Sequence, residues 1–186
     1  MTVPTETTPT ETTPLTRVDT TPLTRADAED LVHRECRLLD ELRYEDWLDR
    51  FTADGIYGLP VRDGSRADAV DQVSIVFDDT ERRAERVFRT LHTPVLDQNP
   101  RSRTVHFASN IEVEDASGAE PVIRCAQLVA ELRPGGDRQV GLNRTRLLAG
   151  RCEYRVRREA GAWRIALKKL VLIESEQPLF NLAFIL

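Results

Sequence analysis

The stretch from Pro121 to Ile173 constrains the fold more than any other part of the chain. Apolar and polar residues alternate along three long segments of it, which is typical of strands with one face in a core. Pro134-Gly135-Gly136-Asp137 and Glu159-Ala160-Gly161-Ala162 separate these segments, and glycine accepts the positive φ that a tight reversal requires. The stretch therefore predicts an antiparallel meander whose apolar face is covered by the rest of the chain. The positions expected on that face are Val122, Ala126, Leu128, Ala130, Leu132, Cys152, Tyr154, Val156, Trp163, Ile165, Leu167, Val171 and Ile173.

A fourth strand is expected just before the meander, from Arg103 to Asp115. Its apolar residues again recur at every second position, apart from one break in the middle. We expect Val105, Phe107, Ile111 and Val113 on the covered face, and His106, Asn110, Glu112 and Glu114 on the outer face.

The N-terminal half supplies the cover. Apolar residues at helical spacing predict a helix that begins after Thr24, as N-cap, and runs to about residue 42. A short second helix is expected from Tyr44 to Phe51 and is ended by Asp54-Gly55. Strands follow at 56–61 and 73–77, and a third helix at 81–91. Residues 1–23 are dominated by Thr and Pro and are expected to form a flexible tail, which leaves 24–186 as one domain.

The order of these elements is helix, helix, strand, strand, helix and then four long antiparallel strands. Helices segregated from a run of strands indicate the α+β class. A strongly curved, mainly antiparallel sheet wrapped around N-terminal helices to form a cone, as in the NTF2-like or cystatin-like superfamily, fits this order.

Charge and composition exclude several classes of function. Residues 124–169 carry 12 basic and 4 acidic residues, but the bases alternate with apolar positions along strands and few aromatic residues accompany them, so we expect no nucleic-acid partner. No apolar run approaches the roughly 20 residues of a membrane span, and no signal peptide is recognisable. Three scattered cysteines, Cys36, Cys125 and Cys152, favour reduced thiols and a cytoplasmic location.

Motifs for catalysis are missing from the sequence. The three histidines are far apart, no pair of Cys-x-His and Cys-x-x-His motifs for a Rieske cluster is present, and neither are a P-loop or a Gly-x-Ser-x-Gly turn. We expect no metal or cofactor in this chain and no catalytic residues. The best acid/base site that the sequence offers combines His106 with Tyr44, Tyr57 or Asp54, although a histidine at a surface or interface is the more ordinary interpretation.

Several motifs together resemble the small (β) subunit of bacterial aromatic-ring-hydroxylating dioxygenases. Their order and spacing span roughly residues 26–186. The motifs are Leu38-Leu39-Asp40-Glu41 with Trp47-Leu48 and Phe51, Phe77-Asp78-Asp79 with Arg82-Arg83 and Arg86-Val87, Pro100-Arg101-Ser102-Arg103-Thr104-Val105-His106 with Ser109-Asn110-Ile111, and Trp163-Arg164-Ile165 with Asn181-Leu182-Ala183-Phe184-Ile185-Leu186.

The resemblance implies the cone-like fold and a non-catalytic, structural role. It places a Rieske 2Fe-2S cluster and a mononuclear Fe(II) in a partner α subunit, which this chain would help to assemble into a complex of three large and three small subunits. NAD(P)H would supply electrons through a reductase, often with a ferredoxin. The product would be a cis-dihydrodiol of an arene or an aromatic acid.

Under this resemblance, several residues become candidates for subunit interfaces. We expect Arg101, Arg103, His106 and Asn110 to form hydrogen bonds across an interface, so that Arg103→Ala weakens assembly and leaves the isolated chain folded. The apolar end of the chain, including Phe180, Leu182 and Phe184, is expected to pack against the sheet or a neighbouring subunit.

Two other functions remain open from the sequence. A free-standing isomerase, dehydratase or polyketide cyclase of the same superfamily would place acid/base residues inside the cone. A plain binding or scaffold module of this fold would need none.

Overall fold

The structure is a computed structural model, and it describes residues 21–62, 73–93, 99–135, 143–179 and 181–186. Three helices and six strands occur in these residues. They are α1 (Arg25–Asp40), α2 (Tyr44–Leu48), β1 (Phe51–Pro60), β2 (Ser74–Asp78), α3 (Thr80–His92), β3 (Arg103–Glu114), β4 (Val122–Leu132), β5 (Thr145–Glu159) and β6 (Ala162–Leu172). The expected tail, apart from its last three residues, and most of the first meander turn lie outside the described residues.

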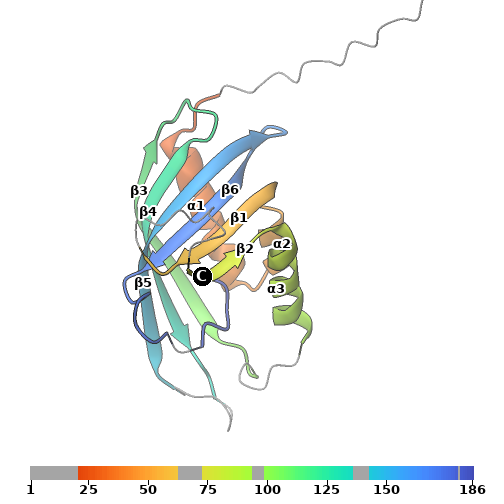
Figure 1. The fold of residues 1–186 in the computed structure, drawn as a ribbon, viewed down its shortest axis with the longest axis vertical. Coiled ribbons are helices and arrows are strands. Elements are labelled where there is room, and N and C mark those ends of the chain that lie inside the picture. Colours follow the sequence, from red (N-terminus) through yellow and green to blue (C-terminus); the bar gives the residue numbers. More distant parts are fainter. Residues whose placement is uncertain (1–20, 63–72, 94–98, 136–142, 180) are drawn as a thin grey trace, which may run out of the picture.

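The six strands form one sheet in the order β2-β1-β6-β5-β4-β3. The four long strands β3 to β6 pair antiparallel, as predicted, and β4 pairs with β5 without interruption from Val122–Arg155 to Leu132–Thr145. β1 joins β6 in parallel. The curved sheet forms one side of the molecule and the helices lie on the other (Figure 1). The predicted α+β architecture is confirmed.

The start of α1 is fixed by a capping box. Thr24 Oγ1 accepts a hydrogen bond from the backbone N–H of Asp27 at 3.1 Å, and the Asp27 carboxylate accepts one from the Thr24 N–H at 3.1 Å. The preceding residue, Leu23, is only 3% exposed and packs in the core. Leu23 therefore ties the start of α1 to the core.

The second helix is shorter than expected, and its predicted end is wrong. α2 stops at Leu48, and Phe51 already pairs with Ile165 of β6. Asp54-Gly55 does not end a helix but lies inside β1. A Cβ on Gly55 would meet the Ile165 carbonyl oxygen at 2.7 Å, so glycine here permits a close approach of two strands rather than a helix stop.

The expected faces of β3 and β4 are also wrong, and so is that of Ile173 just after β6, which is 76% exposed. His106 lies on the covered face, whereas Val105 and Phe107 are 50% and 54% exposed on the outer face. The register shifts between Ser109 and Glu112, and Asn110 has a φ of 55°. This β-bulge moves the following residues to the opposite face. Ile111 is therefore buried, although regular alternation would place it on the same outer face as Val105. On β4 the buried positions are Ile123, Cys125, Gln127, Val129 and Glu131, and the predicted set is only half-buried.

Candidate docking surface and interior polar clusters

Apolar side chains gather on the outer face of β3, β4 and β5. Among the described residues six large hydrophobic side chains are exposed, and four of them, Val105, Phe107, Leu147 and Ile173, are neighbours on this face. Val105 lies opposite Ala130, which lies opposite Leu147. Phe107 lies opposite Leu128, and the Ile173 N–H donates to the Ala149 carbonyl. We call this set the outer apolar patch: Val105, Phe107, Leu128, Ala130, Leu147, Ala149 and Ile173.

Charged residues of both signs lie around the outer apolar patch. Arg103 and Arg151 are exposed beside it, and Glu176 lines a cavity together with Arg151 and Ile173. Further along the same face, acids and bases alternate across the strands, and Arg124 lies 2.8 Å from Glu153 and 2.9 Å from Glu114. The charges of that second region therefore compensate one another, and the rim of the patch is polar and carries both signs. An apolar centre with a polar rim is the usual composition of a protein interface.

The predicted interface residues Arg101, Arg103 and Asn110 do not form one cluster. The Arg101 guanidinium donates to the Leu91 carbonyl at 2.8 Å, and so ties β3 to the end of α3. Arg103 is exposed at the edge of the outer apolar patch. Asn110 is exposed at the bulge and lines a 420 Å³ cavity on the outer face, together with Glu112, Arg124 and Arg151.

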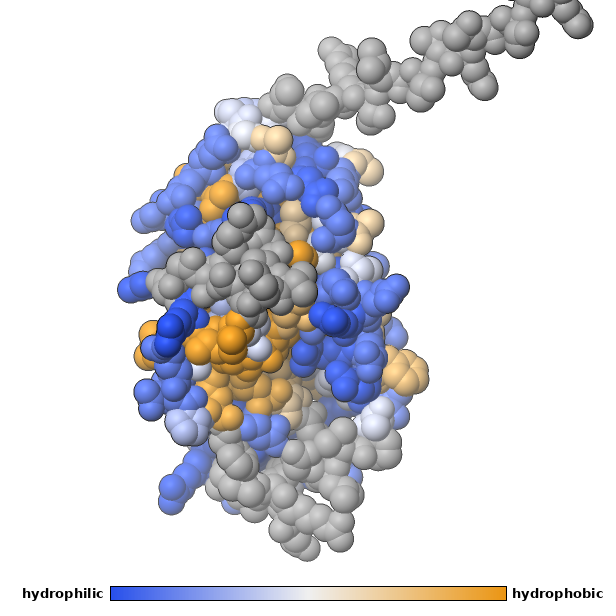
Figure 2. Space-filling view, viewed as in Figure 1, coloured by the Kyte–Doolittle hydropathy of each residue, from blue (hydrophilic) through white to orange (hydrophobic). Residues whose placement is uncertain are grey.

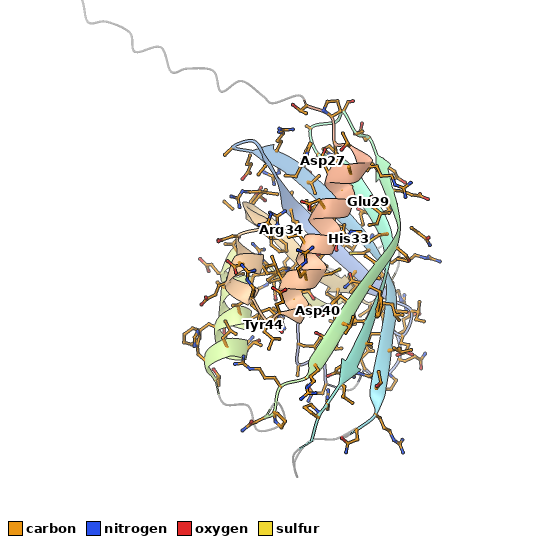
Figure 3. All side chains as sticks on the ribbon, turned by 180° about the vertical axis from the view of Figure 1, so that it is seen from behind. Asp27, Glu29, His33, Arg34, Asp40 and Tyr44 are labelled. Atoms are coloured by element: carbon orange, nitrogen blue, oxygen red, sulfur yellow. The ribbon has the colours of Figure 1, made fainter. Side chains whose placement is uncertain are left out.

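His106 does not lie on the outer face as expected, and another chain cannot contact it there. Its side chain is fully buried, with Nδ1 at 2.6 Å from Oδ1 of Asp40, which lies at the end of α1 beside β3 (Figure 3). Asp40 also accepts hydrogen bonds from the His106 N–H and from Thr104 Oγ1, each at 3.0 Å. Partial burial would raise the pKa of Asp40, but these hydrogen bonds outweigh it and lower the pKa below the ordinary 3.8. Tyr44, Tyr57 and Asp54 do not contact His106 through any such bond.

Replacing Asp40 by asparagine is expected to lower the free energy of unfolding at pH 7 by about 1.5–3 kcal/mol, because charge-assisted hydrogen bonds are lost. The folded pKa of Asp40 is lowered, so its contribution is present above the unfolded value and is lost as the pH falls through the folded value. The difference between wild type and variant should therefore shrink as the pH falls below the ordinary value of 3.8. Urea unfolding at several pH values measures it, with exposed Asp30→Asn as the control.

The apolar end of the chain closes the mouth of the cone. Phe184, Ile185 and Leu186 are buried, Leu182 is half-buried, and Phe180 lies outside the described residues. Figure 2 shows apolar side chains gathered around the place where the chain end lies in Figure 1, between hydrophilic side chains on either side. Phe184 belongs to the core cluster, and Leu182 packs against it.

Glu35 and Lys168 form an interior cluster that the sequence interpretation missed. Their side chains are at most 1% exposed, and Lys168 Nζ lies 3.1 Å from Glu35 Oε1. Glu35 also accepts hydrogen bonds from Trp47 Nε1 at 2.8 Å and from Tyr154 Oη at 2.6 Å. Burial alone would lower the pKa of Lys168, but the charge of Glu35 and other neighbours outweighs it and raises the pKa. Lys168 Nζ and Tyr57 Oη both donate to the main-chain oxygen of Leu186.

A signal for both residues was present in the sequence. Glu35 stands in the apolar helical stripe of α1, three or four residues from Leu31, Val32 and Leu39. Lys168 stands at an inward position of β6, two residues from Ala166 and two from Leu170. Two opposite charges at core positions of different elements indicate a buried ion pair.

The interior clusters do not resemble a metal centre. Within the described residues, no group of three or more His, Cys, Asp and Glu side chains is placed to hold a metal ion. The three cysteines are buried and free, and burial raises the pKa of the Cys36 thiol to about 12. None of the described helices is long and apolar enough to cross a membrane.

Comparison with known proteins identifies the family of the chain. Residues 34–177 match the family model described as the ring-hydroxylating beta subunit. The chain belongs to the ring-hydroxylating β-subunit family. The resemblance carried by the sequence motifs is therefore confirmed, and this chain is a β subunit of the aromatic-ring-hydroxylating dioxygenase type.

Curated relatives of this β subunit belong to dioxygenases of the same kind. It is 34% identical over 160 residues to the small oxygenase component of the p-cumate 2,3-dioxygenase system of Pseudomonas putida, which covers 85% of this chain and 84% of the relative. It is 30% identical over 92 residues to the β subunit of toluate 1,2-dioxygenase of the same organism, covering 47% and 57% of the two chains.

Solved structures confirm the fold of this β subunit. The β subunit of benzoate 1,2-dioxygenase from Burkholderia mallei aligns with a TM-score of 0.65 at 23% identity, over 92% of this chain and 100% of that one. A chain of naphthalene 1,2-dioxygenase aligns with a TM-score of 0.71 at 19% identity, over 87% and 85%. An NTF2-like protein with a cystatin-like fold from Novosphingobium aromaticivorans aligns with a TM-score of 0.54 at 17% identity, over 81% and 82%. The predicted NTF2-like architecture is thereby confirmed.

Proposed function

We propose that this β subunit has no catalytic centre of its own and acts by assembling and stabilising a catalytic α subunit. The observation that carries this proposal is the family match over residues 34–177, together with a curated relative that is called a small oxygenase component. In this proposal a Rieske cluster and a mononuclear iron are held by the larger partner. A complex of three large and three small subunits in the cytoplasm is part of the proposal.

The proposed substrate of the complex is an aromatic acid or a related arene, converted to a cis-dihydrodiol. Support comes from the relatives, whose names give p-cumate, toluate and benzoate as their substrates. NAD(P)H would supply the electrons through a reductase, with or without a ferredoxin. The selecting pocket belongs to the α subunit in this proposal.

The outer apolar patch is the proposed contact with the α subunit. Its exposed side chains, including Phe107 and Leu147, form a continuous apolar surface on a rigid sheet. The family match and the relative called a small oxygenase component favour a different, larger chain over a second copy of this chain as the occupant.

Replacing Phe107 by aspartate is expected to weaken binding of the α subunit by at least about 2 kcal/mol, which is roughly 30-fold, because a charge would enter the centre of an apolar contact. Phe88→Asp is the matched control, since Phe88 is 62% exposed on α3, away from the patch. Titration of the purified α subunit, monitored by calorimetry, measures both affinities. Equal affinities for the two variants would contradict this location of the interface, and a Phe107-dependent homodimer would identify a second copy as the occupant.

Replacing Arg103 by alanine is expected to reduce affinity for the α subunit by about 2 kcal/mol and to make binding less sensitive to salt. Arg103 is exposed in this chain, so the variant should unfold at the same urea concentration as wild type. Size-exclusion chromatography at two salt concentrations measures the assembly. Normal assembly at both concentrations would remove Arg103 from the interface.

The proposed function is tested by producing this chain with and without an α subunit from a relative's dioxygenase system. We expect iron and turnover of aromatic acids only in the complex. The competing acid/base enzyme draws support from the Asp40–His106 pair. If the purified chain alone converts a carbonyl or hydroxyl substrate, and His106→Phe abolishes that turnover, the non-catalytic role is wrong.

A further inference from the structure

Two buried polar side chains inside the cone have no hydrogen-bond partner. His106 is 7% exposed and Gln127 is 4% exposed. Within the described residues, neither Nε2 of His106 nor either polar atom of the Gln127 amide is hydrogen-bonded. Buried polar groups in folded proteins almost always have a partner, because an unmet donor or acceptor destabilises the fold. These two side chains therefore require an explanation.

The two side chains lie on adjoining strands and on the same covered face. His106 of β3 is opposite Val129 of β4, and Gln127 is opposite Ala108. His106 and Gln127 are thus diagonal neighbours, which places their Cβ atoms about 7–8 Å apart and within reach of each other through long side chains. No hydrogen bond joins the two side chains directly. One atom lying between them would be within hydrogen-bond reach of both.

The residues opposite Gln127 on the two neighbouring strands are both small. On β5 this residue is Gly150, and a Cβ there would meet the Val171 carbonyl oxygen at 2.5 Å and Leu170 Cδ1 at 2.9 Å. On the side of β3 the opposing residue is Ala108, whose side chain is a single methyl group.

The hydrogen bonds of Asp40 fix the orientation of the imidazole. Asp40 Oδ1 lies 2.6 Å from Nδ1, and an ionised carboxylate only accepts hydrogen bonds, so Nδ1 carries the hydrogen. Asp40 approaches from α1, on the helical side of β3 (Figure 3). The ring is therefore held in place, and its Nε2 is buried without a hydrogen-bond partner among the described residues.

We propose that His106 Nε2 and the Gln127 amide together bind one hydroxyl oxygen inside the cone. A hydroxyl group both donates and accepts, so it can bond Nε2 in either protonation state of the ring and also bond the amide of Gln127. A carbonyl or an ether only accepts and satisfies fewer of these atoms. The oxygen belongs either to a buried water or to the hydroxyl group of a small alcohol or phenol.

The first test is a double-mutant cycle in the full chain, with Gln127→Met and His106→Phe. If one hydroxyl joins the two residues, Gln127→Met lowers the melting temperature of wild type but leaves it unchanged or raises it in the His106→Phe background. If no hydroxyl joins the two side chains, Gln127→Met raises the melting temperature equally in both backgrounds, since an unsatisfied amide is removed. That second result would overturn the proposal.

The source of the hydroxyl is identified by a second measurement on the same chain. A bound water gives an oxygen within hydrogen-bond distance of both side chains in a crystal structure, and phenol then leaves the melting temperature unchanged. A hydroxyl compound as guest gives a saturable rise of the melting temperature with phenol in wild type that is absent in Gln127→Met. If the crystal structure shows no oxygen and phenol has no effect, the site does not exist.

Discussion

Replacing Glu35 by alanine is expected to lower the free energy of unfolding by about 3–5 kcal/mol, a large part of the stability of a domain of this size. The substitution leaves the ammonium group of Lys168 buried without its carboxylate at 3.1 Å. It also removes the acceptor of the Trp47 and Tyr154 hydrogen bonds. Urea unfolding of the purified chain at pH 7, monitored by tryptophan fluorescence, measures the loss.

The double variant Glu35→Ala/Lys168→Met separates the unpaired charge from the lost packing. Removing both charges should recover part of the loss, because no ion remains buried without a partner. Lys168→Met alone leaves Glu35 with Trp47 and Tyr154 as donors, so it should cost less than Glu35→Ala. A Glu35→Ala variant that loses under about 1 kcal/mol would show that the cluster is hydrated rather than sealed in the core.

The sequence predicts elements better than it predicts faces. The long strands and the helices on one side follow from periodicity, and the structure confirms them. On β3, Val105 and Phe107 alternate with His106 in the sequence. The two apolar residues face outward, whereas His106 is buried beside Asp40. Periodicity identifies two faces but does not say which one is covered. In the sequence, a strand face that is apolar because it contacts a partner has the same pattern as one that is apolar because it lies in the core.

Polar residues inside the cone explain why the sequence pattern assigns the wrong face of β4 to the core. Gln127 and Glu131 occupy covered positions of β4, where apolar residues are expected. Glu131 is tolerated there because it accepts hydrogen bonds from Ser102 at 2.7 Å and from two arginines, Arg133 and Arg146. These partners come from residues that are close in space but not visible as a sequence motif. Local pattern cannot reveal such a group, whereas the family motifs around Pro100–His106 did lead to the correct family.

For the same reason, the sequence does not predict which of the proposed interface residues are exposed. The resemblance makes both Arg103 and His106 interface candidates, but Arg103 is exposed, whereas His106, three residues later, lies on the opposite face and is buried. Arg101 is held by the Leu91 carbonyl of α3. The exposed side chains that gather around Arg103 are apolar, and only the sheet register of β3, β4 and β5 brings them together.

Deleting residues 179–186 is expected to abolish the soluble folded chain. Phe184, Ile185 and Leu186 are each under 10% exposed, and burial of such side chains stabilises a protein by about 1.5–3 kcal/mol each. Their loss together, roughly 5–9 kcal/mol, approaches the whole stability of a typical domain. The soluble fraction after expression, and the elution volume of any soluble protein, measure the effect.

Lost polar contacts add to the effect of the deletion. The Asn181 carbonyl accepts hydrogen bonds from Arg133 at 2.7 Å and from Arg146 at 3.1 Å, and the main-chain oxygen of Leu186 accepts one from Lys168 at 2.8 Å. Without the segment, three cations near or inside the core lose an acceptor, and the mouth of the cone exposes its apolar lining to water. Leu182→Ala, which shortens one half-buried side chain of the same segment, is the matched control and should stay soluble. A truncated chain that remained soluble and still bound the α subunit would show that the segment neither seals the core nor supports assembly.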